Sequence, residues 1–413
     1  MTTLLAPLRE PRFRALVTGR TFADFANAVA PFALAFAVVD LTGSAVDLGI
    51  VVGARSVANI LLVLFGGMLA DRLPRSVILQ GTETAAALTQ ATIAASVLCG
   101  FASVPLLVGL SLVNGAVSAI SLPAAASLTP LTVPTTLLAQ ANALVRLLSN
   151  VGRIAGASLA GILVAVVGSG WALAGNALLF VAAALSYHRI RLPGGDRIPG
   201  SRPLAELAEG WREFRARSWV WLVVLQFMLV NAVNSGAIVV IGPLVADDTF
   251  GRTGWGLALA VQTAGALLGG IIAAHWRPRR MLFLGVALVM VDALPMIALG
   301  VTPYLAPLLL AMFLGGIAIE QFSVAWDVSL QENIPPHKLA RVYSYDMLGS
   351  FLALPLGQIS AGPLAEHVGR EPTLIGGAVL VVVTTALVLC SPQIRGLVRR
   401  TPVAPGGGSP GSH

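Results

Sequence analysis

Carboxyl groups inside long apolar stretches are the residues of this chain with the clearest potential for chemistry. Asp24 lies in an apolar stretch near the start, and Glu320 and Asp327 lie seven residues apart on one helical face of another. An ionisable group is costly inside a membrane helix, and an apolar surrounding favours its protonated form. We therefore predict that these three acids bind and release protons. Two alternatives stay open: an orienting pair of Asp24 with Arg20, and a structural cap at Asp327.

Other polar side chains in the apolar stretches could contact a substrate. Arg55 needs a partner, which could be Asp24, Asp47 or a substrate anion. Small polar residues in membrane helices also serve as packing contacts between helices, so that alternative stays open for each. The predicted substrate-cavity residues are Asn27, Arg55, Asn59, Asn114, Ser118, Arg153, Gln226, Asn231, Asn234, Gln262 and Trp326.

The composition excludes a water-soluble protein. Of 413 residues, 56% are hydrophobic and 11% charged, with a mean hydropathy of +0.84, whereas a soluble domain is about 25% charged. The net charge of +7 does not indicate a nucleic-acid partner, because the basic residues lie in loops between apolar runs. Cys99 and Cys390 lie in separate apolar stretches, so no structural disulfide is expected.

Twelve apolar stretches are long enough to cross a bilayer, which needs roughly 20 residues each. Basic clusters lie in the loops of one side, whereas the other side is acidic, with only Arg252 and Arg370 as basic residues. This asymmetry predicts both termini in the cytoplasm and a multi-pass protein of the cytoplasmic membrane. The stretches are 15–39, 46–70, 76–99, 103–126, 138–167, 171–190, 219–245, 254–275, 281–300, 303–330, 343–367 and 373–391.

An internal repeat divides the chain into two similar halves. The loop sequence GMLADRLPRS at 67–76 has a weaker copy, GIIAAHWRPRR, at 270–280. A loop repeated once per half indicates a duplicated bundle of membrane helices. We predict an N-terminal six-helix half at 1–190, a cytoplasmic linker with an amphipathic segment at 191–217, a C-terminal half at 218–392 and a disordered tail at 393–413.

The first copy of this loop resembles the signature of the major facilitator superfamily. Gly67, Asp71, Arg72 and Arg75 fit the signature, while Pro74 replaces a usual glycine. The stretches DLTGSAVDLG (40–49), ANALVRLLSNVGRIAGASLAG (141–161) and PLGQISAGPLAEHVG (355–369) resemble the enterobactin-exporter and macrolide-efflux branch. The resemblance implies an all-α membrane protein of twelve transmembrane helices in two pseudo-symmetric six-helix halves.

The resemblance also implies roles for several residues. The predicted conformational latch, which would hold the cytoplasmic side shut, consists of Gly67, Asp71, Arg72, Arg75 and Asp346. Glu83 and Asp292 fall on helices that pack outside the cavity in the resembled fold, so structural pairing is expected for both. Two antiporter features are missing, because Leu112 stands where an arginine is usual and Ala157 follows Gly156 where a proline is usual.

These observations predict a proton-coupled exporter of amphipathic small molecules, such as antibiotics or siderophores, that works by alternating access. The alternatives are an uptake symporter or uniporter, and a non-transporting receptor with the same fold. No cofactor is expected besides the proton gradient, because the phosphate-binding pattern GxxxxGK[ST] is absent and the histidines are scattered. We expect no enzyme activity, no metal and no nucleic-acid partner. The expected partners are the substrate, protons and lipid, and the protein is expected to be a monomer.

Overall fold

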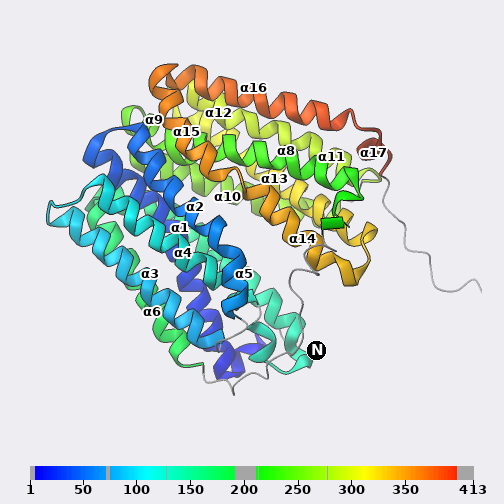
Figure 1. The fold of residues 1–413 in the computed structure, drawn as a ribbon, viewed down its shortest axis with the longest axis horizontal. Coiled ribbons are helices and arrows are strands. Elements are labelled where there is room, and N and C mark those ends of the chain that lie inside the picture. The colour runs from blue at the N-terminus through cyan, green and yellow to red at the C-terminus, as the bar shows by residue number, and fades with distance from the viewer. Residues whose placement is uncertain are drawn as a thin grey trace, which may run out of the picture.

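The computed structural model describes residues 5–70, 75–126, 128–190, 211–212, 214–276 and 278–397. These residues are nearly all helical, with no strand among them, and form the twelve-helix fold in two halves (Figure 1). Ten helical segments within them are long and apolar enough to cross a membrane. The two other long helices carry more polar residues, such as Glu83 in one and Arg153 in the other. The predicted all-α membrane fold is therefore confirmed.

The N-terminal half consists of six long helices. The first begins at Pro11, where a missing backbone N–H is tolerated, and ends before Gly43, whose φ of 64° suits a residue without a Cβ. The elements are η1 (Ala6–Arg9), α1 (Pro11–Thr42), α2 (Ala45–Ala70), α3 (Arg75–Leu98), α4 (Val104–Ala126), η2 (Thr129–Leu131), η3 (Thr135–Leu137), α5 (Leu138–Val167) and α6 (Ser169–His188).

The C-terminal half also crosses six times, but three of its passes are interrupted. The seventh pass comprises α8 (Ser218–Ser235), the π-helical η4 (Gly236–Ile241) and α9 (Gly242–Asp248), and the ninth comprises α11 (Met281–Leu288), η5 (Val289–Asp292) and α12 (Ala293–Val301). The eleventh breaks between α14 (Pro336–Phe351) and α15 (Leu354–His367), where Pro355 lies in the first turn of α15. The remaining helices are α10 (Gly251–His275), α13 (Leu305–Asn333), α16 (Arg370–Leu389) and the short α17 (Pro392–Gly396).

The two halves contact each other at one end of the bundle, which we call the closed end; it includes Asp40, Ser44, Arg252 and Glu366. There α2 packs against α15, and α5 packs against α10. The approach of α5 to α10 depends on two glycines, because a Cβ on Gly161 would lie 2.7 Å from the Gly256 Cα atom. Figure 1 shows the halves diverging from this end, toward α14 and α17 in one half and the N-terminus in the other.

The linker between the halves is described only at its end. Residues 191–210 lie outside the described residues, so most of the predicted linker remains a prediction. Trp211 and Phe214 stack with ring centroids 5.7 Å apart, and both rings lie within 6 Å of the Tyr345 ring of α14. The aromatic side of this segment therefore packs on the C-terminal half, while Arg212 and Arg215 are exposed. The segment predicted as the tail begins within α17, and residues 398–413 lie outside the described residues.

Candidate functional site

Asp24 lies on α1 with one enclosed carboxylate oxygen, although the side chain as a whole remains partly accessible. The side chain is 26% exposed, yet the Oδ2 atom is buried without a hydrogen-bond partner among the described residues. The Nε atom of Arg20 lies 3.8 Å from Oδ2, which makes a loose ion pair one helical turn away but no hydrogen bond. An orienting ion pair with Arg20 and proton binding by Asp24 are therefore compatible, because this loose ion pair offsets only part of the carboxylate charge.

Asn27 and Arg55 are brought together between α1 and α2. The Arg55 guanidinium donates a hydrogen bond of 3.1 Å to Asn27 Oδ1, and the Asn27 amide donates in turn to the Ala23 carbonyl oxygen at 2.9 Å. Arg55 thus has a neutral partner in this structure, and its positive charge is not matched by that contact. Asn59, one turn along α2, donates a long hydrogen bond of 3.5 Å to the Gly115 carbonyl oxygen of α4.

Glu320 and Arg153 come from opposite halves and act on each other electrostatically. Glu320, on α13, is half-buried, and a Cβ on Gly270 of α10 would lie 3.8 Å from its Oε1 atom. Arg153 of α5 is exposed, and its positive charge acts electrostatically on Glu320. The neighbouring Gln321 donates a 2.7 Å hydrogen bond to the Gly269 carbonyl oxygen, which fixes α13 against α10. Opposite charges from the two halves thus influence each other where α5 and α13 both pack against α10.

Asp327 and Trp326 differ in their surroundings although they are adjacent. Asp327 is exposed and accepts a 2.9 Å hydrogen bond from the Tyr343 hydroxyl of α14. Trp326 is buried in an aromatic cluster beside Phe322, and its indole N–H donates a 2.9 Å hydrogen bond to Asp346 Oδ2. The burial of Trp326 favours a packing role, and its place in a substrate cavity stays a prediction.

Four further cavity candidates hydrogen-bond within their own half. Asn234 donates at 3.2 Å to Asp292 of η5, which gives Asp292 the structural partner expected for it. The other three donate between neighbouring helices, and Ser118 and Gln262 are half-exposed. These bonds match the packing alternative, so substrate contact by these residues stays a prediction. The three bonds are Asn114 to Thr89 at 3.2 Å, Gln226 to Thr385 at 2.8 Å and Asn231 to the Ser350 carbonyl oxygen at 3.0 Å.

Two of the five residues of the predicted conformational latch lie outside the described residues. These two are Asp71 and Arg72. For Gly67, in α2, and Arg75, at the start of α3, the structure describes the backbone alone. Asp346 is held within the C-terminal half, where it accepts hydrogen bonds from Trp326 and, at 3.2 Å, from the Ser350 hydroxyl. The latch stays a prediction.

Sequence reasoning missed a set of polar contacts at the closed end. Arg252 of α10 lies 2.5 Å from Asp40 of α1 and 2.7 Å from Asp247 of α9, and its guanidinium stacks 4.7 Å over the Phe36 ring. The Ser44 hydroxyl also donates to Glu366 across the halves at 3.2 Å. The available signal was the rarity of arginines on the acidic side, which indicates orientation and also marks Arg252 as a candidate for pairing.

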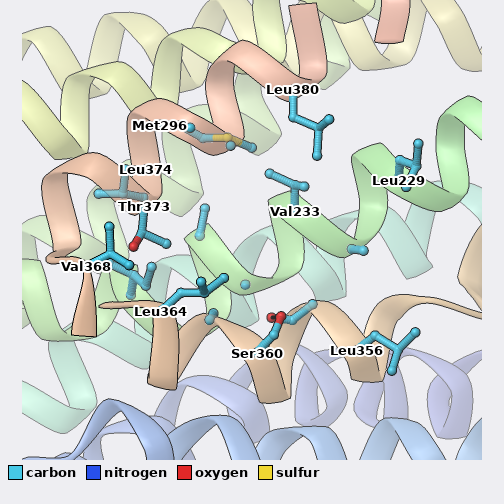
Figure 2. A pocket seen from close by; sticks show the side chains of 18 of the residues that line it. Leu229, Val233, Met296, Leu356, Ser360, Leu364, Val368, Thr373, Leu374 and Leu380 are labelled. Carbon is cyan, nitrogen blue, oxygen red and sulfur yellow. Dashed lines mark hydrogen bonds between the residues drawn. The ribbon is translucent and has the colours of Figure 1, made fainter. Parts of the chain in front are cut away.

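Two apolar cavities lie within single halves. One, of about 510 Å³, is lined by α8, η4, α15 and α16 (Figure 2), and the other, of about 620 Å³, lies between α3 and α6. Figure 2 shows mainly aliphatic side chains, with Ser360 and Thr373 as the labelled polar ones. Both cavities lack charged lining residues, so neither supplies proton chemistry. In the part of the chain that is described, no group of three acids, histidines or cysteines could hold a metal ion.

Comparisons with known proteins agree with this architecture. The chain is 25% identical to the multidrug efflux pump Tap of Mycolicibacterium fortuitum, covering 96% of this chain and 98% of Tap. It is 22% identical to macrolide efflux protein A of Streptococcus pyogenes, covering 90% and 93% of the two chains.

Solved structures show the same fold at low sequence identity. A point mutant of the nucleoside transporter NupG matches with a TM-score of 0.77 at 14% identity, covering 92% of this chain and 99% of that one. A bacterial homologue of the human lysosomal transporter Spinster, inward-facing and unoccupied, matches with a TM-score of 0.72 at 19% identity, covering 93% and 96%. The sequence model of the Major Facilitator Superfamily matches residues 16–357. This chain therefore belongs to the Major Facilitator Superfamily, and it is a membrane transporter rather than an enzyme.

Proposed function

We propose that this protein is a proton-coupled exporter of amphipathic small molecules in the cytoplasmic membrane, acting as a monomer by alternating access. Two relatives that align with most of the chain are named efflux pumps. The basic clusters predict that the termini are cytoplasmic, so the closed end would face outward. The structure would then represent a state that is shut to the outside and accessible from the cytoplasm.

The observation that carries the proton coupling is the environment of Asp24. Its carboxylate lies in a transmembrane helix, has a buried oxygen without a hydrogen-bond partner among the described residues, and is still partly exposed. A proton can therefore reach it, and an acid inside a membrane helix is a candidate for proton binding. A proton that moves inward releases about 2.3 kcal/mol per 100 mV, enough to support a gradient of roughly fifty-fold per proton.

Arg153 and Glu320 supply a second element of the proposal. They bring opposite charges to the interface between the halves, and this interface must rearrange when the accessible side changes. A substrate with both polar and apolar parts could contact these charges and the surrounding apolar helix faces. Protonation of Glu320 would weaken its attraction to Arg153, which would link proton binding to the separation of the halves.

The test is a panel of toxic compounds applied to cells that lack their own efflux pumps. Cells that express the wild-type protein should tolerate a subset of compounds and accumulate less of them, whereas Asp24→Asn should remove this protection. Glu371→Gln is a matched control, because Glu371 is an exposed acid in the first turn of α16. Equal protection by wild type and Asp24→Asn would refute the role of Asp24, and increased accumulation with wild type would indicate uptake instead of export.

A further inference from the structure

Glu83 is a buried acid in the N-terminal half that the proposed function does not use. It lies on α3, is 6% exposed, and its Oε2 atom is buried without a hydrogen-bond partner among the described residues. An ionised carboxylate that is withdrawn from water without a partner is strongly unfavourable. We therefore expect Glu83 to be a neutral carboxylic acid in this state.

The packing around α3 places Glu83 at the level of the acid on α1. One turn before Glu83, Leu79 belongs to the same buried cluster as Ala23 of α1. About one turn after it, Ala86 belongs to a cluster with Ala26 of α1. Apolar clusters shared with α1 thus lie both one turn before and one turn after Glu83, and the charge of Asp24 on α1 acts on the Glu83 carboxyl.

Charged and titratable groups of α1 and α6 bear on this pair, and α5 and α2, which pack against α1, carry Arg153 and Arg55. From α1, the charges of Asp24 and Arg20 act on the same site, and from α6 comes Tyr187, whose ring packs so closely on Gly19 that a Cβ there would lie 2.8 Å from the ring. His188, also on α6, is exposed and lies 3.2 Å from Gln80, one turn before Glu83 on α3. The helix α4 has no titratable side chain.

One arginine cannot neutralise the negative charges of two ionised acids at this position. Arg20 can compensate one carboxylate, and it lies beside Asp24 at 3.8 Å. We propose that Asp24 and Glu83 form a single proton-binding site between α1, α3 and α6, in which Glu83 stores the proton and the partly exposed Asp24 exchanges it with water. On release, the Glu83 carboxyl gives up its proton, which passes to water on the accessible side of Asp24; the net charge of Asp24, Glu83 and Arg20 then changes from 0 to −1.

The C-terminal half has a related arrangement without the second acid. Its third pass carries the buried Asp292, and its first pass supplies the Asn234 amide, which donates to Asp292 Oδ2 at 3.2 Å. Because an amide stands there in place of an acid, Asp292 has no carboxylate at that position to pass a proton to water. Asp292→Asn is therefore the matched control, since it removes a buried acid whose partner is an amide and not a second carboxylate.

The proposal rests on the proposed function only for its use in transport, so the site can be tested separately. Infrared spectra of the purified full-length protein, recorded as the pH is raised and returned, would follow the C=O band of protonated carboxylic acids. The wild type should show a reversible band, Glu83→Gln should lack one carboxyl per protein, and Glu83→Asp should restore it. Asp292→Asn should leave the reversible band in place. In Asp24→Asn, the C=O band of Glu83 should not change with pH within the time that the wild-type band needs to respond.

An unchanged reversible band in Glu83→Gln would overturn the proposal, as would a band in Asp24→Asn that responds as fast as in the wild type. Circular dichroism and size-exclusion chromatography would show that each variant is folded. If the band behaves as expected but transport does not depend on a pH gradient, the proton site stands and the proposed function fails.

Discussion

Removal of Arg252 should open the closed end of the molecule. Arg252→Ala loses the ion pair with Asp40, which joins the two halves. It also loses the stacking of the guanidinium on the Phe36 ring. The variant also leaves the carboxylates of Asp40 and Asp247 near each other without the cation between them. All three effects weaken the state in which the halves meet at this end, and we expect none of them to weaken the alternative state.

The magnitude follows from the exposure of these groups. Arg252 is 23% exposed and Asp40 is 38% exposed, so solvent screening limits the ion pair to about 0.2–1 kcal/mol. The cation–π contact to the buried Phe36 ring contributes about 0.5–1 kcal/mol more. A total of about 1–2 kcal/mol corresponds to a change of roughly 5- to 30-fold in the ratio of the two states.

Spin labels on the exposed positions Thr42 and Val368 would report this ratio, because these residues flank the closed end in opposite halves. Pulsed electron spin resonance should show the longer-distance population rising in Arg252→Ala. The matched control is Arg370→Ala, since Arg370 pairs at the same end with Asp248 of its own half. The reasoning is refuted if Arg252→Ala leaves the distance distribution unchanged or if Arg370→Ala shifts it equally.

Three further predictions follow from the described contacts. Asp24→Asn should remove the dependence of export on a pH gradient while substrate binding, followed by tryptophan fluorescence, changes less than about two-fold; an unaltered pH dependence would contradict this. Gly161→Ala should reduce transport several-fold because its Cβ would meet Gly256, whereas Gly175→Ala, which faces open space, should be neutral in the same assay; equal rates would contradict the tight helix crossing. Asn234→Ala should destabilise the protein by about 1–3 kcal/mol, because Asp292 loses a buried hydrogen-bond donor. A thermal unfolding curve in detergent that is identical to that of the wild type would contradict this.

The fold could be predicted from the sequence because the signals of membrane helices are local. Long apolar runs, the loop repeat and the distribution of arginines each depend on residues close together in the chain. The break in the eleventh pass was also predictable, since Pro355 and the nearby glycines act on the local backbone. The π-helical segment Gly236–Ile241 was not predicted, because no single residue type marks it.

The candidate site was harder to predict, since it depends on which face each helix turns to its neighbours. The resembled fold predicts structural pairing for Glu83, whereas the structure buries its Oε2 atom without a hydrogen-bond partner among the described residues. The position of Trp326 beside Asp327 predicts a cavity residue; in the structure its ring packs against other aromatic rings, and contact with a substrate stays a prediction. Sequence spacing defines a helical face, whereas only the packing defines what that face contacts.

The central claim, that proton movement drives export, is tested most directly with purified protein in liposomes loaded with a compound identified in the tolerance panel. An imposed pH difference should drive the compound against its own gradient, with protons moving in the opposite direction, and reversing the pH difference should reverse the flux. A flux that follows only the compound's own gradient, with or without the pH difference, would contradict the account and identify a passive carrier.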